Sequence, residues 1–409
     1  MLNVRAGRSQ GLLPMLGPAF VAAVAYVDPG NVAANISAGA TYSYMLVWVL
    51  VLANAIAVLV QYQSAKLGLV TGQSLPELLG DRLPTGRRIA FWLQAEIIAA
   101  ATDLAEIIGG AIALQLLFGL PLIVGGVIVG VVSMSLLIFQ NVRRQRQFEA
   151  IVVALLAIIT CGFLAGLFID PPSAGGVLSG LVPRFSDTNS VLIAASMLGA
   201  TVMPHAIYLH SSLVNHRFAK KGRNFKLLLR ATRADVVSAL IVAGAVNLGL
   251  LLLAASALGG RAGTDSIEGA HAAIADVLGP GIGVVFAVGL LASSLASTSV
   301  GAYAGSEIMG GLLHVRVPLW VRRLVTLIPA LVVLWAYPNP SWALVISQVA
   351  LSFGIPFAII PLTKYTADRG VMGDYRDGPV MRVAMVTVSV LIVVLNFALI
   401  YLTLTGAGV

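Results

Sequence analysis

Long apolar segments follow one another through nearly the whole sequence, and they constrain the fold more than any other feature. About 20 apolar residues span the hydrocarbon core of a bilayer as one helix. Measured against that length, the sequence predicts eleven membrane-spanning helices. They cover residues 12–40, 44–68, 89–117, 121–139, 148–168, 190–214, 235–258, 280–312, 321–336, 342–364 and 381–404. We therefore expect an all-α membrane protein, with residues 1–409 forming a single polytopic domain.

The composition supports the same fold class. Hydrophobic residues make up 58% of the chain and charged residues only 10%, with a mean hydropathy of +0.95. Soluble domains are about 25% charged. The single cysteine, Cys161, excludes disulfides within the chain and a cysteine metal cluster. No small-residue cleavage site follows a short apolar core near the N-terminus, so we expect no removable signal peptide.

The positive charges follow the topology of the predicted spans. If the N-terminus lies inside, 23 of the 25 lysines and arginines fall on the inner side, and only Arg184 and Arg261 fall outside. An excess of Lys and Arg marks the cytoplasmic side of membrane proteins. The sequence thus predicts a cytoplasmic N-terminus and, with an odd number of spans, an extracytoplasmic C-terminus. This arrangement also explains the net charge of +8 without a nucleic-acid partner.

Asp28-Pro29-Gly30-Asn31 interrupts the first apolar segment near its middle. Proline removes a backbone donor and clashes with the preceding turn, and glycine is a poor helix former, so both disrupt an α-helix. A carboxylate inside a membrane is stable only when it meets a cation or a proton. The sequence therefore predicts a broken first helix with an ionisable group at the break.

A second break is predicted in the sixth segment, at Met203-Pro204-His205. Breaks at corresponding positions of two halves point to an inverted-repeat transporter with its site near the middle of the membrane. The two repeats of five spans would cover about 12–168 and 190–364, with 381–404 as an additional helix. Plain proline kinks are the alternative, but kinks alone would not require an acid, an amide and a thioether at the break points.

The residues at the two breaks form a metal-ligand set. Asp28 offers a carboxylate, Asn31 an amide oxygen, Ala200 a carbonyl freed by the break, and Met203 a soft thioether. Oxygen ligands alone suit Mg²⁺, Ca²⁺ or Mn²⁺, and a sulfur ligand shifts the preference toward transition metals. A lone buried methionine is more often core packing than a ligand. Its place immediately before a helix-breaking proline favours coordination of Mn²⁺ or Fe²⁺, with Cd²⁺ also accepted.

Five motifs, in order along the chain, carry a resemblance to a known family. They are Asp28-Pro29-Gly30-Asn31, Ala65-Lys66-Leu67-Gly68 with Val70-Thr71-Gly72, Asp103-Leu104-Ala105-Glu106 with Gly109-Gly110-Ala111, Met203-Pro204-His205 followed by Ile207-Tyr208-Leu209-His210, and Ser347-Gln348-Val349 through Pro356-Phe357. The chain resembles the Nramp transporters, which are manganese and iron proton symporters. One departure is Ala206, where the family commonly has Asn, but this position is not an expected ligand. Related magnesium transporters lack the methionine ligand, so Met203 argues against that branch.

The resemblance implies a LeuT-like fold of eleven helices, with the first and sixth unwound around the metal. It implies Asp28, Asn31, Met203 and the Ala200 carbonyl as ligands, and Gln348 as a further ligand once the site closes from outside. It further implies a monomeric symporter in the cell membrane, with metal ions and protons as substrates and no cofactor. Both Mn²⁺ and Fe²⁺ satisfy this ligand set, and the proton stoichiometry stays open.

Three carboxylates in the third segment suggest a route for the proton. Glu96, Asp103 and Glu106 are seven and three residues apart, which places them on one helical face. Each must be neutralised or paired inside a membrane. The expected partners are the basic residues near inner helix ends, namely Arg217, Arg322 and Arg323. A static salt-bridge network is the alternative, whereas the resemblance implies a proton path from Asp28 through Asp103 and Glu106 to the cytoplasm.

The histidines of the sixth segment have several interpretations. His205, two residues after Met203, could be a ligand, a proton acceptor or a core histidine satisfied by its neighbours. The resemblance implies a role in proton coupling and gating more than in coordination. His210 is expected to line an inner vestibule.

Other functions fit the residues less well. A sodium-coupled transporter of an organic solute could share the fold, but its site would favour small residues and a free helix N-terminus over an acid facing a thioether. A channel would not need paired breaks in the middle of two spans. An enzyme is not expected, because the sequence contains no nucleophile–base pair, phosphate-binding loop or cofactor motif.

Overall fold

The structure is a computed structural model that describes residues 17–137, 145–218, 225–261, 263–264, 266–315, 317–336 and 340–405. Residues 12–16 of the first predicted span lie outside this part of the chain. So do eight of the basic residues used for the topology, namely Arg5, Arg8, Arg143, Arg144, Lys220, Lys221, Arg223 and Arg316.

The regular structure of the described residues is entirely helical. The elements are α1 (Pro18–Val24), η2 (Ala25–Val27), α2 (Pro29–Tyr42), α3 (Val47–Thr71), α4 (Leu75–Arg82), α5 (Thr85–Phe118), α6 (Leu122–Leu137), α7 (Gln145–Leu164), η4 (Ala165–Phe168), α8 (Ala174–Gly180), α9 (Thr188–Thr201), α10 (Pro204–Phe218), α11 (Phe225–Leu253), η5 (Ala254–Leu258), α12 (Ile267–Leu278), α13 (Pro280–Leu313), α14 (Leu319–Ala336), α15 (Pro340–Ala367), α16 (Arg369–Met372), η6 (Gly373–Tyr375) and α17 (Pro379–Thr405).

The helices agree with an all-α membrane protein, which confirms the predicted class. Each of the eleven predicted segments falls mainly on helical residues where the structure describes it, and non-helical residues interrupt the first and the sixth. Among the described residues, seven helical stretches are long and apolar enough to cross a membrane. They are Val47–Thr71, Thr85–Phe118, Glu149–Phe168, Thr188–Phe218, Phe225–Leu258, Pro280–Leu313 and Pro379–Ala398. Pro18–Val27 and Leu122–Ser135 are shorter apolar helices, so a count of eleven spans stays a prediction.

The first helix breaks at Asp28. After the 3₁₀ turn η2, Asp28 is extended, with φ −70° and ψ 167°, and Pro29 is the first residue of α2. Proline suits that position because the first turn of a helix needs no donor there. The Asp28 side chain accepts a hydrogen bond from the Asn31 backbone N–H at 2.8 Å, which caps α2. The motif therefore ends one helical segment and starts the next.

The sixth predicted span breaks in the same manner. Helix α9 ends at Thr201, Val202 has φ −102° and ψ 77°, and Pro204 is the first residue of α10. Helix α10 begins with a hydrogen bond from the Ile207 N–H to the Met203 carbonyl at 3.3 Å. The two broken helices contact each other through α2 and α9 and through α1 and α10.

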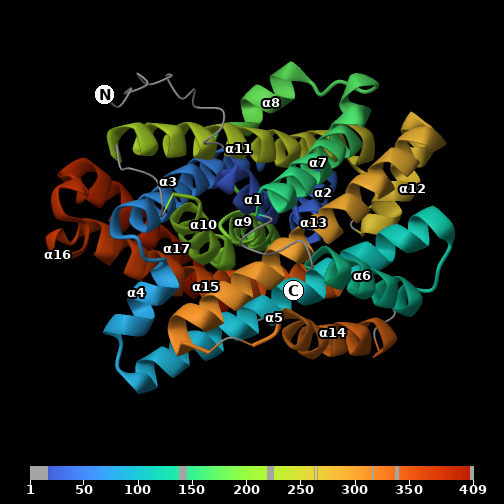
Figure 1. Cartoon of the computed structure of the whole chain (residues 1–409). Coiled ribbons are helices and arrows are strands. Elements are labelled where there is room, and N and C mark those ends of the chain that lie inside the picture. The colour runs from blue at the N-terminus through green and yellow to red at the C-terminus, as the bar shows by residue number, and fades with distance from the viewer. Residues whose placement is uncertain are drawn as a thin grey trace, which may run out of the picture.

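Long helices enclose the two broken ones. Helices α5 and α13, each of 34 residues, pack along each other, and α11 contacts α1, α2 and α3. In Figure 1, α11 runs along one side of the bundle and α5 and α14 lie on the other, with α1, α2, α9 and α10 between them. The breaks consequently lie in the interior of the protein, where irregular backbone at membrane depth is tolerated.

Short helices occupy connections that the sequence analysis left without structure. Helix α4 starts with a capping box in which Ser74 and Glu77 each satisfy the other's backbone N–H. Figure 1 places α4 and α16 at one end of the bundle and α12 at the other. These connections follow the second, tenth and seventh predicted spans, so their positions alternate as the predicted topology requires.

Candidate metal site

One amide side chain joins the two helix breaks. The Nδ2 of Asn31 donates hydrogen bonds to Asp28 Oδ1 at 2.8 Å and to the Ala200 carbonyl oxygen at 2.9 Å. Asp28, Asn31 and Ala200 are all completely buried. Three of the residues predicted from separate segments of the sequence thus lie together at one point between α2 and α9.

Two oxygens at this point have no hydrogen-bond partner among the described residues: Asp28 Oδ2 and Asn31 Oδ1. A buried acceptor without a donor is costly, and nearly all such atoms in native proteins are satisfied. A bound cation would satisfy both oxygens at once. The described residues contain no group of three or more His, Cys, Asp or Glu that could hold a metal, so a cation here would also need ligands of other types.

Met203 and Gln348 complete the predicted ligand set. Met203 is fully buried at the second break, three residues after Ala200. Gln348 is a buried residue of α15, and a Cβ atom on Gly30 would overlap its Nε2, so this side chain lies directly on the first turn of α2. Gln348 Oε1 also lacks a hydrogen-bond partner among the described residues. The same helix reaches the second break, because a Cβ on Gly199 would lie 3.2 Å from the Gln348 carbonyl.

Side chains from distant helices form hydrogen bonds with the backbone carbonyls at the first break. Asn247 of α11 donates to the Tyr26 carbonyl at 2.6 Å, and Ser293 of α13 donates to the Val27 carbonyl. Asn247 in turn accepts from Asn35 at 2.9 Å. These bonds satisfy carbonyls that lose their helical partners at the break. Sequence reasoning missed Asn247 and Ser293, although a polar residue within an apolar span is the signal that could have identified them.

The three carboxylates of α5 lie toward α13 and α14. Glu96 pairs with Arg322 at 2.7 Å, and Asp103 pairs with Arg323 at 3.0 Å. Glu106 is completely buried, and neither of its carboxylate oxygens has a hydrogen-bond partner among the described residues. Two of the three basic partners suggested by the sequence therefore meet this stripe.

Arg217 has a different partner. It forms an ion pair with Glu149 of α7 at 2.9 Å. Arg217 lies in the last turn of α10 and pairs with α7, whereas Glu96 and Asp103 pair with arginines at the start of α14. Sequence reasoning did not identify Glu149, which lies close enough to α1 that a Cβ on Gly17 would be 2.8 Å from its Oε2.

Both predicted histidines of α10 are buried. His205 Nδ1 has no partner among the described residues. His210 Nδ1 lies 2.8 Å from Gln61 Oε1, and Gln61 Nε2 donates to the Tyr26 hydroxyl at 2.5 Å. His210 was expected to line an inner vestibule, but in this conformation it is packed inside a hydrogen-bonded chain that reaches the first break.

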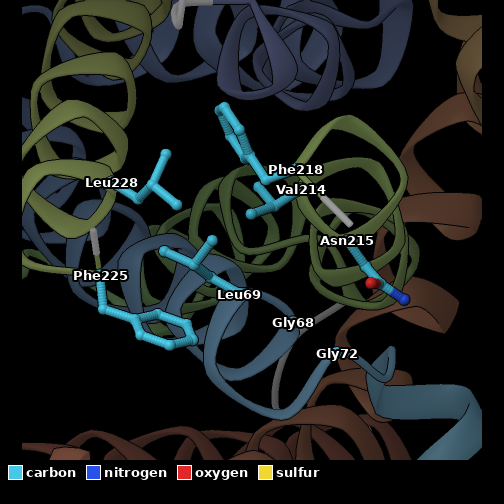
Figure 2. A pocket seen from close by; sticks show the side chains of 8 residues that line it. All are labelled: Gly68, Leu69, Gly72, Val214, Asn215, Phe218, Phe225 and Leu228. Carbon is cyan, nitrogen blue, oxygen red and sulfur yellow. The ribbon is translucent and has the colours of Figure 1, made fainter. Parts of the chain in front are cut away.

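Two pockets among the described residues lie away from these side chains. Figure 2 shows one between the ends of α3 and α10 and the start of α11, where Leu69, Val214, Phe218 and Leu228 surround a small space. Its volume is about 10 Å³, which is at most enough for one water molecule. A larger groove of about 300 Å³ lies between α15 and α17, and its lining contains no carboxylate. Neither pocket is suited to bind a metal ion.

Comparisons with known proteins agree with this geometry. The model of the Nramp family, described as natural resistance-associated macrophage protein-like, matches residues 19–402. The chain belongs to the Nramp family. The predicted resemblance is thereby confirmed over nearly the whole chain.

Nramp relatives match at high identity. The divalent metal cation transporter MntH of Mycobacterium tuberculosis (strain CDC 1551 / Oshkosh) is 57% identical over 394 residues, which cover 96% of this chain and 92% of the relative. MntH of Bacillus subtilis (strain 168) is 44% identical over 395 residues, covering 96% and 92%.

Solved structures share the fold. The Eremococcus coleocola manganese transporter, in complex with an aromatic bis-isothiourea substituted compound, superposes with a TM-score of 0.86 at 30% identity, covering 97% of this chain and 88% of that one. Mhp1, a nucleobase-cation-symport-1 family transporter, superposes with a TM-score of 0.59 at 16% identity, covering 94% and 89%. The second match shows a common fold only.

Proposed function

We propose that this chain imports divalent transition-metal ions, Mn²⁺ together with Fe²⁺ and Cd²⁺, by proton symport with alternating access. The observation that carries the proposal is the Asn31 bridge between the two breaks, which brings the Asp28 carboxylate, the Asn31 amide and the Ala200 carbonyl to one buried point. The relatives are a divalent metal cation transporter and a manganese transporter, which supports the same class of substrate.

The ligand types set the preferred cation. Asp28, Asn31 and the Ala200 carbonyl supply hard oxygens, and Gln348 adds another when it stays over α2. Oxygens alone would accept Ca²⁺ and Mg²⁺, which are abundant and hard. The Met203 thioether favours softer transition metals over both. The metal is the transported substrate, so the chain needs no cofactor and we do not expect an enzyme.

Metal binding and proton movement meet at Asp28. In the outward-open state, Asp28, Asn31, Met203 and the freed carbonyl replace most of the water molecules bound to Mn²⁺. A cation binds the ionised carboxylate, so the metal displaces any proton held by Asp28. We propose that this proton passes to Asp103 and then along Glu106, with His205 assisting. The Glu96–Arg322 and Asp103–Arg323 pairs and Arg217 would continue the route to the cytoplasm.

The two breaks act as hinges for alternating access. We infer two inverted repeats, at about 12–168 and 190–364, with the broken helices swinging as half-helices around the site. Gln348 closes the outer side, because Gly30 leaves room for its side chain on α2. A negative-inside potential would add roughly 2.3 kcal/mol per charge for every 100 mV.

We further propose that the protein is a monomer in the cell membrane, with a cytoplasmic N-terminus and an extracytoplasmic C-terminus. The one-sided distribution of Lys and Arg supports this orientation. The positions of α4 and α16 at one end of the bundle and α12 at the other agree with it.

Replacing Met203 by alanine should change selectivity more than affinity for Mn²⁺. The thioether contributes most to binding of soft ions, so Cd²⁺ uptake should fall about tenfold or more while Mn²⁺ uptake falls less. Exclusion of Ca²⁺ and Mg²⁺ should relax. Competition of each ion against Mn²⁺ uptake in proteoliposomes measures this. Met197, a buried methionine of α9 that precedes the break, is the matched control and should keep wild-type selectivity as Met197→Ala.

Proton symport is tested by recording metal uptake and internal pH together in proteoliposomes. We expect Mn²⁺ entry to acidify the interior and an inward proton gradient to accelerate Mn²⁺ entry. Uptake of Mn²⁺ with no change of internal pH would show that the protein transports the metal without a coupled proton, and it would contradict proton symport.

A further inference from the structure

Two glycines of α13 face the carboxylate stripe of α5. Gly301 and Gly305 are four residues apart, so they lie on the same side of α13, which packs along α5. A Cβ on Gly301 would lie 3.3 and 3.4 Å from the two carboxylate oxygens of Glu106 and 3.7 Å from Asp103 Oδ1. The absence of a side chain at Gly301 therefore lets the Glu106 carboxylate pack closely against α13, with Asp103 beside it.

Gly305 lies against Arg322, which pairs with Glu96 of the same stripe. A Cβ on Gly305 would overlap the guanidinium group of Arg322, whose side chain is largely buried and reaches Glu96 at 2.7 Å. Arg322 thus crosses α13 where that helix has no side chain. A side chain at this position would require the end of the Arg322 side chain, which carries the group that pairs with Glu96, to move away from α13.

The carboxylate of Glu106 faces Gly301 inside the part of the protein that the structure describes. Glu106 is completely buried, and both of its carboxylate oxygens lack a hydrogen-bond partner there. The Thr298 hydroxyl, one turn before Gly301 on α13, lies beside this carboxylate. A buried carboxylate kept in this setting is expected to exchange a proton or an ion rather than to stabilise packing.

A third glycine on the same helix shows that this requirement is local. A Cβ on Gly310 would meet no atom within 4 Å, so no neighbouring group depends on the absence of a side chain there. Gly301 and Gly305, by contrast, are both in contact with ionisable side chains of the predicted proton route.

We propose that Gly301 and Gly305 are positioning residues of the proton route. Because neither has a side chain, Glu106 can lie beside Asp103, and Arg322 can reach Glu96. The proposal rests on the proton symport proposed above. Neither glycine touches the metal, so a methyl group at either position should alter proton transfer and leave metal binding intact.

The test uses Gly301→Ala, Gly305→Ala and the control Gly310→Ala in the full-length chain. Mn²⁺ binding is measured by calorimetry in detergent, and Mn²⁺-driven acidification is measured in proteoliposomes. We expect all three variants to bind Mn²⁺ as the wild type does. Gly301→Ala and Gly305→Ala should reduce acidification by about tenfold or more, because small displacements of reacting groups have large effects on transfer rates. Gly310→Ala should acidify normally.

A second substitution separates positioning from general damage. Glu106→Asp shortens the carboxylate, so Gly301→Ala combined with Glu106→Asp should recover part of the acidification lost by Gly301→Ala alone. The proposal is overturned if Gly301→Ala and Gly305→Ala acidify like Gly310→Ala, if they lose Mn²⁺ binding together with transport, or if the shortened carboxylate gives no recovery. Absence of acidification in the wild type would instead overturn proton symport itself, and this proposal with it.

Discussion

Asp28→Ala should reduce Mn²⁺ uptake in proteoliposomes by at least about 100-fold. Asp28 is the charged residue of the predicted ligand set, and its Oδ2 has no hydrogen-bond partner among the described residues. Loss of a residue that merely supports a metal ligand typically costs 10–100-fold in affinity, so loss of the one charged ligand should cost at least as much. Initial uptake rates over a range of Mn²⁺ concentrations measure the effect.

Asp28→Asn separates the charge from the helix cap. Asp28 caps α2 through Oδ1, and loss of such a cap costs about 1 kcal/mol of stability. Asparagine keeps an oxygen at this position, so Asp28→Asn should fold as the wild type does and still fail to transport Mn²⁺. Near-normal uptake by either variant would show that the metal binds elsewhere.

Arg323→Ala should destabilise the protein by roughly 3–5 kcal/mol, which is typical when one partner of a buried ion pair is removed. Arg323 is among the largest completely buried side chains, and it pairs with Asp103 and donates to Ser133 Oγ at 3.1 Å. Its removal leaves the Asp103 charge buried without its cation. The midpoint of thermal unfolding in detergent should fall accordingly, and Mn²⁺-driven acidification should be lost.

The matched control is the double variant Arg323→Ala with Asp103→Asn. Removing both charges eliminates the uncompensated carboxylate, so the double variant should recover much of the lost stability. Acidification should stay absent, because Asp103 belongs to the proposed route. If the effects of the two substitutions on the free energy of unfolding were additive, the Arg323–Asp103 interaction would contribute nothing to stability. If acidification returned in the double variant, Asp103 would not carry the proton.

The helix breaks could be predicted because they are local. Pro29 and Pro204 cannot donate a backbone hydrogen bond and Gly30 is a poor helix former, so each disfavours a continuous helix through its own backbone chemistry. Asp28 and Asn31 lie within one turn of the first break, and Met203 directly precedes the second, so their meeting followed once the two helices were paired. The corresponding positions of the breaks in two predicted repeats indicated that pairing, and the resemblance to the Nramp family supplied Gln348.

The residues that support the breaks could not be predicted in the same manner. Asn247 and Ser293 lie more than 200 residues from the carbonyls that they satisfy, and only the packing of α11 and α13 against η2 selects them. The pairing of Arg217 with Glu149 rather than with the α5 stripe has the same origin. Charges identify which groups need partners, but the contacts between helices decide which partners they receive.

The central claim is that one metal ion binds where the two breaks meet. Anomalous diffraction from crystals grown with Mn²⁺, recorded on both sides of the manganese absorption edge, tests it most directly. We predict one strong peak in direct contact with the Asp28 carboxylate, the Ala200 carbonyl and the Met203 sulfur. A manganese peak at another site, with none between α2 and α9, would contradict the assignment.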